Sequence, residues 1–249
     1  MPTCSRPFRP LASTRTACVA VSALIVLSLS APGCGSSSPS RAGQGVLILA
    51  AASTINALDD AIAEFTDATG IQVRASYGPT STLARQVTSG APADLLLSAS
   101  TTWANYVAGH QTIVARSSIA GNRLVVVVPR ETTIGTTVDL ASLVSDARFS
   151  RIAIADTEAV PAGVYAREAL ETLGLWSRIE PRLLPTLDVR AALALAAGRE
   201  ADAAFVYSSD AATSDAVRVI TSIDESTHSP IEYPLLLLDA ESSQAAELY

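Results

Sequence analysis

The chain has 249 residues, of which 49% are hydrophobic and 16% are charged, so it is too apolar for a disordered protein and long enough for a sizeable core. All 17 basic residues are arginine and 24 residues are acidic, and the resulting net charge of −7 argues against a protein that binds nucleic acid through phosphate contacts. The three cysteines, Cys4, Cys18 and Cys34, all precede residue 35, which argues against a disulfide framework or a thiolate metal site in the rest of the chain.

The N-terminus has the pattern of a secretory signal peptide. Arg6, Arg9 and Arg15 precede an apolar run over residues 17–29, and small residues follow that run. A membrane-spanning helix is the alternative, but it would need about 20 consecutive apolar residues, and this run is shorter. We therefore expect residues 1–33 to be a signal peptide that is removed on export.

Gly33 and Cys34 resemble the end of a bacterial lipobox, in which the chain is cut before the cysteine and the cysteine is acylated. Ala31 and Pro32 depart from the usual residues of that motif. Residues 34–44 are rich in Gly and Ser and are expected to form a flexible tether. The pattern predicts an extracytoplasmic protein anchored through a lipid on Cys34, with cleavage nearby and free secretion as the alternative. Removal of the signal peptide would leave 14 basic and 24 acidic residues, a charge of −10.

The next part of the chain alternates between predicted strands and predicted helices. Short apolar runs indicate buried strands, and apolar residues at helical spacing indicate helices that begin at polar caps and end at glycines. Ser53 and the pair Thr80–Ser81 stand at the starts of two of these helices. Strands are predicted at residues 45–50, 71–77 and 94–99, and helices at 53–69, at 82–89 and in a short segment after 101.

A second alternating series begins with residues 123–129, whose continuous β-branched run indicates a central strand. Strands that alternate with helices predict an α/β fold with mostly parallel sheets, and the two series, which meet near Pro129, indicate two lobes. The further strands are predicted at 151–155, 183–184, 203–207, 217–221 and 232–238, and the helices at 139–144, 161–173, 189–197 and from 208.

Open α/β sheets bind ligands beyond the carboxyl ends of their strands, where helices begin. Helix N-termini present unpaired N–H groups and a partial positive charge, so they bind anions without Lys or Arg. Each hydroxyl residue at such a position could be a plain helix cap, but several at the same end of two sheets favour an anion site. The residues selected in this way are Ser53, Thr80–Ser81, Ala162, Asp188–Val189 and Tyr207.

Motifs for other chemistry are absent from the sequence. It contains no GxGxxG, GxxxxGK[ST], GxSxG or HExxH pattern. A Ser-His-Asp triad would need His110 or His228, and neither follows a predicted strand near a suitable serine. Asp59 and Asp60 are neighbours on one helix, so they do not converge as catalytic carboxylates and are interpreted as a solvated face.

Several segments between about Gly45 and Pro234 form a recognisable series. They are LAAAS (49–53) with Asn56–Ala57, STLARQ (81–86), GAPADL (90–95), GNRLVVV (121–127), VPAGVYA (160–166), DVRAAL (188–193) and VYSSDA (206–211). In this order and spacing they resemble the periplasmic molybdate-binding proteins of ABC importers. STLARQ, GAPADL and VPAGVYA are the most specific of these motifs.

The resemblance implies a two-lobe periplasmic-binding-protein fold of type II, in the α/β class, with a mostly parallel sheet flanked by helices in each lobe. It implies a first lobe over residues 45–128, a second lobe over 129–230 and a return of residues 231–249 to the first lobe. Members of the family continue into a last helix, which this chain, ending at Tyr249, is expected to lack.

The resemblance also implies a binding site and a mode of action. Thr80 stands where the family has serine, so its methyl group would tighten the pocket rim, or Ser81 would take over. The implied protein is a monomer and not an enzyme, has no cofactor and delivers molybdate or tungstate to the membrane permease of an ABC importer. Molybdenum would be held only through the oxygen atoms of the anion. The family's oxyanion contacts, matched position by position, fall on Ser53, Thr80, Ala162, Val189 and Tyr207.

Two other functions stay open at this point. A protein for sulfate or another tetrahedral oxyanion would use the same donors, because sulfate has the charge and shape of molybdate. A hydrolase with Ser53 or Tyr207 as its nucleophile would need a general base, and no histidine or carboxylate is predicted at the ligand-facing helix starts.

Overall fold

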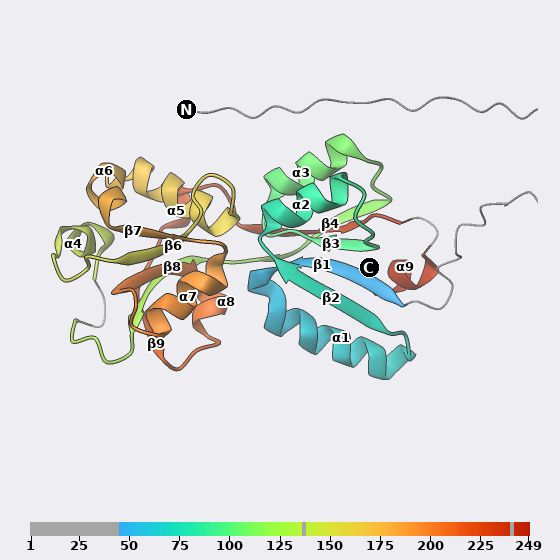
Figure 1. Ribbon diagram of the computed structural model, residues 1–249, viewed down its shortest axis with the longest axis horizontal. Coiled ribbons are helices and arrows are strands. Elements are labelled where there is room, and N and C mark those ends of the chain that lie inside the picture. The colour runs from blue at the N-terminus through green and yellow to red at the C-terminus, as the bar shows by residue number, and fades with distance from the viewer. Residues whose placement is uncertain (1–44, 136–137, 240–241) are drawn as a thin grey trace, which may run out of the picture. The chain divides into compact units, whose positions relative to one another are not determined.

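The computed structural model describes residues 45–135, 138–239 and 242–249 (Figure 1). The predicted signal peptide (1–33) and the tether with Cys34 (34–44) lie outside the described residues. The described chain forms two five-stranded sheets with helices on their faces, which confirms the predicted α/β class. No helix in these ranges is both long and apolar enough to span a membrane.

The first sheet and its helices make up the first lobe. β1 pairs in parallel with β2 and β3, whereas β10 is antiparallel to both β3 and β4. Only β10 therefore runs against the common direction, and the sheet is mostly parallel, as expected. The strands lie in the order β2 (Val73–Gly78), β1 (Val46–Ala51), β3 (Leu95–Leu97), β10 (Glu232–Leu237) and β4 (Ala115–Gly121).

Helices cover both faces of this sheet (Figure 1). The 3-10 turn η1 (Ala52–Thr54) leads into α1 (Ile55–Thr69), which packs against β2, while α2 (Thr80–Thr88) and α3 (Thr101–His110) lie on the other face. α1 ends at Gly70, which has the left-handed φ of 75° that glycine tolerates best.

The second lobe repeats this plan with a different set of strands. β6 is parallel to β7 and β8, and β5 is antiparallel to β8 and β9, so again one strand is reversed. The order is β7 (Leu183–Thr186), β6 (Ile152–Ala155), β8 (Ala203–Tyr207), β5 (Leu124–Pro129) and β9 (Val217–Ser222).

Two main helices lie on opposite faces of the second sheet (Figure 1). They are α5 (Pro161–Thr172) and α7 (Val189–Ala197), and both pack against β6 and β8. The shorter elements are α4 (Leu140–Ser145), α6 (Trp176–Ile179), η2 (Glu180–Arg182), α8 (Ser208–Ala211) and η3 (Glu225–Thr227).

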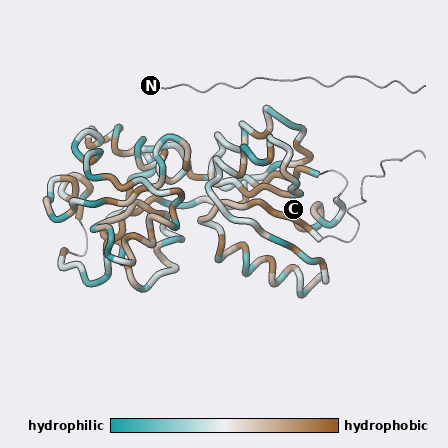
Figure 2. The backbone as a smooth tube through the Cα atoms, in the orientation of Figure 1, coloured by the Kyte–Doolittle hydropathy of each residue, from teal (hydrophilic) through white to brown (hydrophobic). Residues whose placement is uncertain are grey.

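The strands supply most of the hydrophobic core. Residues 124–128 of β5 are each at most 3% exposed, which fits the burial expected of their β-branched run. Figure 2 shows that hydrophobic residues are concentrated along the strands of both sheets, whereas α1 mixes hydrophobic and hydrophilic residues and contains no fully buried residue.

The chain crosses from the first sheet to the second at residues 122–123 and returns through residues 223–231. The lobe boundary that we expected at residue 128 therefore falls inside β5, which belongs to the second sheet. The physical reason is that Pro129 ends a strand and not a lobe, because the crossover lies before the strand begins.

Two further elements differ from the prediction. β4 was not predicted, since this strand forms an edge of its sheet and most of its side chains are exposed, so it carries no apolar run. No helix was expected after β10, yet α9 (Ser243–Leu248) forms there. The Ser242 side chain caps α9 by accepting a hydrogen bond from the Ala245 amide at 3.2 Å, and Ala245 is buried.

Candidate functional site

The carboxyl ends of β1, β2, β6, β7 and β8 converge on a small cavity between the two lobes. Its volume is about 20 Å³, little more than the roughly 10–15 Å³ that one ordered water needs. Such a space is of the size that suits a small ion. Its lining includes all five residues matched to the family's oxyanion contacts, namely Ser53, Thr80, Ala162, Val189 and Tyr207.

Three helices of nine or more residues begin at the cavity wall. They are α2, α5 and α7, with Thr80, Ala162 and Val189 in their first turns. The first N–H groups of an α-helix have no acceptor within the helix, and together they carry a partial positive charge. The wall therefore presents backbone donors from both lobes to anything that occupies the cavity.

Gly163 explains how α5 comes so close to the end of β6. A Cβ atom at this position would overlap the carbonyl oxygens of Ala155 and Asp156, which are backbone atoms that cannot turn aside. Glycine therefore lets the first turn of α5, with Ala162, pack directly on the strand end. The glycine of the VPAG motif is therefore required at this position for steric reasons.

The Tyr207 hydroxyl is the most unusual group in the wall. Tyr207 is only 1% exposed, and its oxygen has no hydrogen-bond partner among the described atoms. Burial holds the pKa of Tyr207 well above its usual value, so the group keeps its proton. A buried O–H without an acceptor costs about 1–3 kcal/mol, and a ligand oxygen in the cavity would remove that cost.

The other two hydroxyls in the wall, those of Thr80 and Ser53, each have a hydrogen-bond partner in the protein. Thr80 Oγ1 accepts a bond from the Ala99 amide at 3.2 Å, which leaves its own proton available to donate. Ser81 is buried but is not part of the cavity lining, so Thr80 is the hydroxyl residue of this helix start that faces the cavity. Ser53 Oγ lies 3.1 Å from the hydroxyl of Tyr233.

The expectation that no carboxylate stands at the ligand-facing helix starts is wrong, because the lining contains one ionisable carboxylate; the lining contains no arginine. The carboxylate belongs to Asp188, which caps α7 by accepting a hydrogen bond from the Ala191 amide at 2.9 Å. Neither His110 nor His228 lines the cavity. Within the described ranges, no group of three or more His, Cys, Asp and Glu residues could hold a metal ion.

Behind this wall lies an ion pair that no sequence pattern indicated. Arg190 Nε is 2.5 Å from Oδ1 of Asp210, whose side chain is completely buried. Burial raises the pKa of Asp210 to about 7, although the charge of Arg190 opposes this shift. Asp210 and Arg190 stand in the matched motifs VYSSDA and DVRAAL, but those motifs give no sign that the two side chains meet.

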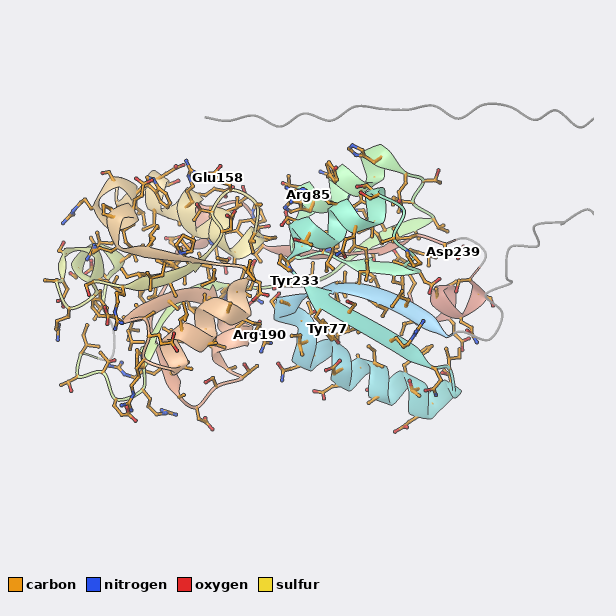
Figure 3. All side chains as sticks on the ribbon, viewed as in Figure 1. Tyr77, Arg85, Glu158, Arg190, Tyr233 and Asp239 are labelled. Atoms are coloured by element: carbon orange, nitrogen blue, oxygen red, sulfur yellow. The ribbon has the colours of Figure 1, made fainter. Side chains whose placement is uncertain are left out.

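Arg190 also joins the two lobes. Its Nη2 atom, which belongs to the second lobe, donates to the Asn56 side chain at 2.9 Å and lies 3.5 Å from the Ser53 carbonyl oxygen. On α3, Trp103 Nε1 donates to the Ala159 carbonyl of the second lobe at 2.8 Å. Figure 3 shows Arg190 and Tyr233 where the lobes meet.

The fold and the site together define a class of protein. Two α/β lobes, joined by two crossings and enclosing an ion-sized cavity of hydrogen-bond donors, are the architecture of a solute-binding protein rather than of a scaffold or a nucleic-acid reader.

Comparison with known proteins agrees with this class. The chain belongs to the family described as bacterial extracellular solute-binding protein, whose model matches residues 46–249. The molybdate-binding protein ModA of Escherichia coli K12 is 38% identical over 211 residues, covering 82% of this chain and 81% of that protein. The protein of the same name from Haemophilus influenzae is 35% identical and covers 78% of each.

A solved structure shares the fold. The periplasmic molybdate-binding protein of Azotobacter vinelandii superposes with a TM-score of 0.72 at 20% sequence identity, covering 82% of this chain and 90% of that one. The match confirms the two-lobe arrangement that the sequence motifs implied. The family places the protein outside the cytoplasm, as a solute-binding protein.

Proposed function

We propose that this protein captures molybdate, and equally tungstate, outside the cytoplasm and delivers it to the membrane permease of an ABC importer. One observation carries the proposal most directly. The protonated hydroxyl of Tyr207 is buried without a partner at a cavity whose other polar wall groups are hydroxyls, helix N-termini and the Asp188 carboxylate, which already accepts a hydrogen bond from the Ala191 amide. Such a site offers mainly hydrogen-bond donors to a ligand.

The donors suit a fully ionised anion. Molybdate near neutral pH is a dianion without a proton, so each of its oxygens can accept. Hydrogen phosphate carries a proton that would need an acceptor in the wall, and a buried polar group without a partner costs about 1–3 kcal/mol. Charge-assisted hydrogen bonds contribute about 1.5–3 kcal/mol each after the exchange with water is counted, so five of them would favour binding of the dianion.

Sulfate is the chemical competitor that donors alone cannot reject. It has the charge and shape of molybdate but shorter bonds to oxygen, so in a cavity of fixed size some donors would lie beyond hydrogen-bond distance. Selection for molybdate therefore rests on size, whereas rejection of phosphate rests on the proton. We propose that the protein acts by binding alone, as a monomer, without catalysis and without a resident cofactor.

Isothermal titration calorimetry on the exported protein tests this proposal. Molybdate and tungstate should bind with nearly equal affinity, sulfate much more weakly, and hydrogen phosphate least. Sulfate binding as tight as molybdate binding would support the alternative of a general oxyanion or sulfate carrier. Tight binding of phosphate would contradict the donor argument itself.

Membrane attachment is a separate part of the proposal. We propose that Cys34, which follows the signal peptide and begins the polar tether, carries the lipid anchor. The Cys34→Ala variant should then move from the membrane fraction to the soluble fraction, with no change in molybdate affinity. Mass spectrometry that finds wild-type protein without acylation would contradict the anchor and leave the binding function intact.

A further inference from the structure

Ser53 is connected to a chain of side chains that runs out of the cavity wall. Its Oγ atom is 3.1 Å from the hydroxyl of Tyr233 in β10. The same hydroxyl is 3.1 Å from Nδ2 of Asn122, which lies in the crossing between β4 and β5. Neither Tyr233 nor Asn122 is part of the cavity lining.

The direction of this chain can be worked out from one backbone atom. The amide of Arg123 donates a hydrogen bond to the Asn122 side chain at 2.9 Å, and a backbone N–H can only donate. The atom that accepts from it must therefore be Oδ1, and the side-chain nitrogen Nδ2 must point the other way. This identifies the two ends of the amide without any assumption about its orientation.

The second link follows from the first. Asn122 Nδ2 can only donate, so it donates to the Tyr233 hydroxyl, and it also donates to Ser209 Oγ at 2.8 Å. Tyr233 is 4% exposed, and burial raises its pKa, so it keeps its proton. The remaining neighbour able to accept that proton in the described hydrogen bonds is Ser53 Oγ.

The last residue of this hydrogen-bonded chain, Ser53, lines the cavity. Because Ser53 Oγ accepts from Tyr233, the serine does not need to donate its own proton to the protein. That proton is left to point at a ligand. A serine oxygen has two lone pairs, so Ser53 could still accept a second hydrogen bond. In the relay Asn122–Tyr233–Ser53, however, the serine's own proton would then have no acceptor, which favours donation to the ligand.

We infer that Asn122 and Tyr233 are specificity-determining positioning residues, which fix Ser53 as a donor and so make the site reject tetrahedral anions that carry a proton. This inference rests on the proposed function and deepens it. The five wall residues explain why a dianion is bound. The relay explains why acceptance of the proton of hydrogen phosphate is costly, because the serine's own proton would then lack a partner.

The test compares sulfate with hydrogen phosphate at mildly alkaline pH, where both are dianions of similar size that differ by one proton. Competition against bound molybdate gives both affinities, and their ratio is the readout. Tyr233→Phe removes the hydroxyl but gives the serine proton no new acceptor, so the preference for sulfate should stay close to that of wild type.

A second variant should reverse the relay. In Asn122→Asp both side-chain oxygens can only accept, so Tyr233 would donate to Asp, accept from Ser53 and leave serine lone pairs facing the cavity. The serine proton then has Tyr233 as its acceptor, so the preference for sulfate should fall about tenfold. The added negative charge weakens the binding of both dianions alike, so it cancels in the ratio.

Tyr77→Phe is the matched control. It removes the hydroxyl of another tyrosine, which bonds Asp59 in the first lobe, and it should leave the ratio unchanged. Equal ratios in wild type and Asn122→Asp, with a melting temperature like that of the control, would overturn the inference and leave molybdate binding in place. Failure of wild type to bind molybdate at all would instead contradict the proposed function, and this inference with it.

Discussion

Removal of the Tyr207 hydroxyl group should change ligand affinity without lowering the stability of the protein. It makes no hydrogen bond in the part of the chain that the structure describes, so the Tyr207→Phe variant loses no interaction of the ligand-free protein. Its free energy of unfolding should be equal to that of wild type or slightly greater. Molybdate affinity should fall about 10- to 150-fold, the value of a hydrogen bond to a charged group.

Urea unfolding without ligand and calorimetry with molybdate measure the two effects of Tyr207→Phe. A variant that is clearly less stable, yet binds molybdate normally, would show that the hydroxyl serves the fold and not the ligand.

The buried carboxyl group of Asp210 should make stability depend on pH. Its pKa is about 7 in the folded protein and close to 3.8 otherwise. Between about pH 4 and 7 the folded state therefore binds more protons than the unfolded state, so this group's contribution to stability falls as pH rises through that window. The limit is about 1.4 kcal/mol per pH unit.

Asp210→Asn should lack this slope. Urea unfolding of both proteins across the pH range gives the difference in their free energies, which should decline with rising pH up to about 7 and then stay level. Two curves that run parallel throughout would contradict the raised pKa of Asp210.

At the scale of an element, the position of α5 depends on Gly163. The Gly163→Ala variant would push the first turn of α5 away from the backbone of Ala155 and Asp156, and with it the amide of Ala162. We expect a loss of about 1–3 kcal/mol of stability, typical of overpacking, together with weaker molybdate binding.

Gly109→Ala is the control for Gly163→Ala. Gly109 lies in α3, and a Cβ atom added there would have no neighbouring atom within 4 Å, so alanine should be neutral or stabilising by up to about 1 kcal/mol. If Gly163→Ala behaved like Gly109→Ala in thermal melts and calorimetry, close packing at the start of α5 would not matter for the site.

The contact between α7 and the start of α1 should hold the lobes together around a bound anion. Asn56→Ala removes the side-chain oxygen that accepts from Arg190 at 2.9 Å and leaves the Arg190–Asp210 pair in place. We expect molybdate to dissociate about two- to fivefold faster, because a hydrogen bond at a partly exposed charged group contributes up to about 1 kcal/mol.

Stopped-flow measurement of molybdate release tests the Asn56 prediction. Asn105→Ala is the matched control, since Asn105 accepts a hydrogen bond from Arg116 at 2.6 Å within the first lobe. The same release rate in both variants would mean that the Asn56–Arg190 contact does not hold the lobes together.

The elements also show which features of the fold could be predicted and which could not. Local signals such as the glycine after α1, the Asp188 cap and the apolar run of β5 predicted their elements, because each depends on neighbouring residues alone. The edge strand β4 was missed because its exposed side chains carry no apolar pattern. The crossing before β5 was misplaced because pairing partners lie far away in the sequence.

Some features of the site could also be predicted from the sequence, and others could not. The five wall residues could be identified because they stand at helix starts and in matched motifs. The contacts behind them could not, because Ser53 and Tyr233 are 180 residues apart and Asn122 and Tyr233 are 111 apart. The residue types of such a relay are visible in a sequence, but burial and donor direction emerge only when distant strands meet.

At the scale of the whole molecule, the negative net charge of the protein opposes the binding of an anion. Without its signal peptide the chain would carry a charge of −10, and the nearest arginine behind the wall, Arg190, is balanced by Asp210. Helix N-termini and hydroxyls solve this problem locally, because they offer positive potential without a net charge. We therefore expect the binding energy to come from oriented dipoles of both lobes and not from the overall field.

Anomalous X-ray diffraction from crystals grown with tungstate tests the central claim most directly, because the heavy atom reports its own position. We predict one strong peak in the cavity between the lobes, with the anion's oxygens within hydrogen-bond distance of Ser53, Thr80 and Tyr207 and of the amides of Ala162 and Val189. A strong peak elsewhere on the protein, or an empty cavity at saturating tungstate, would contradict it.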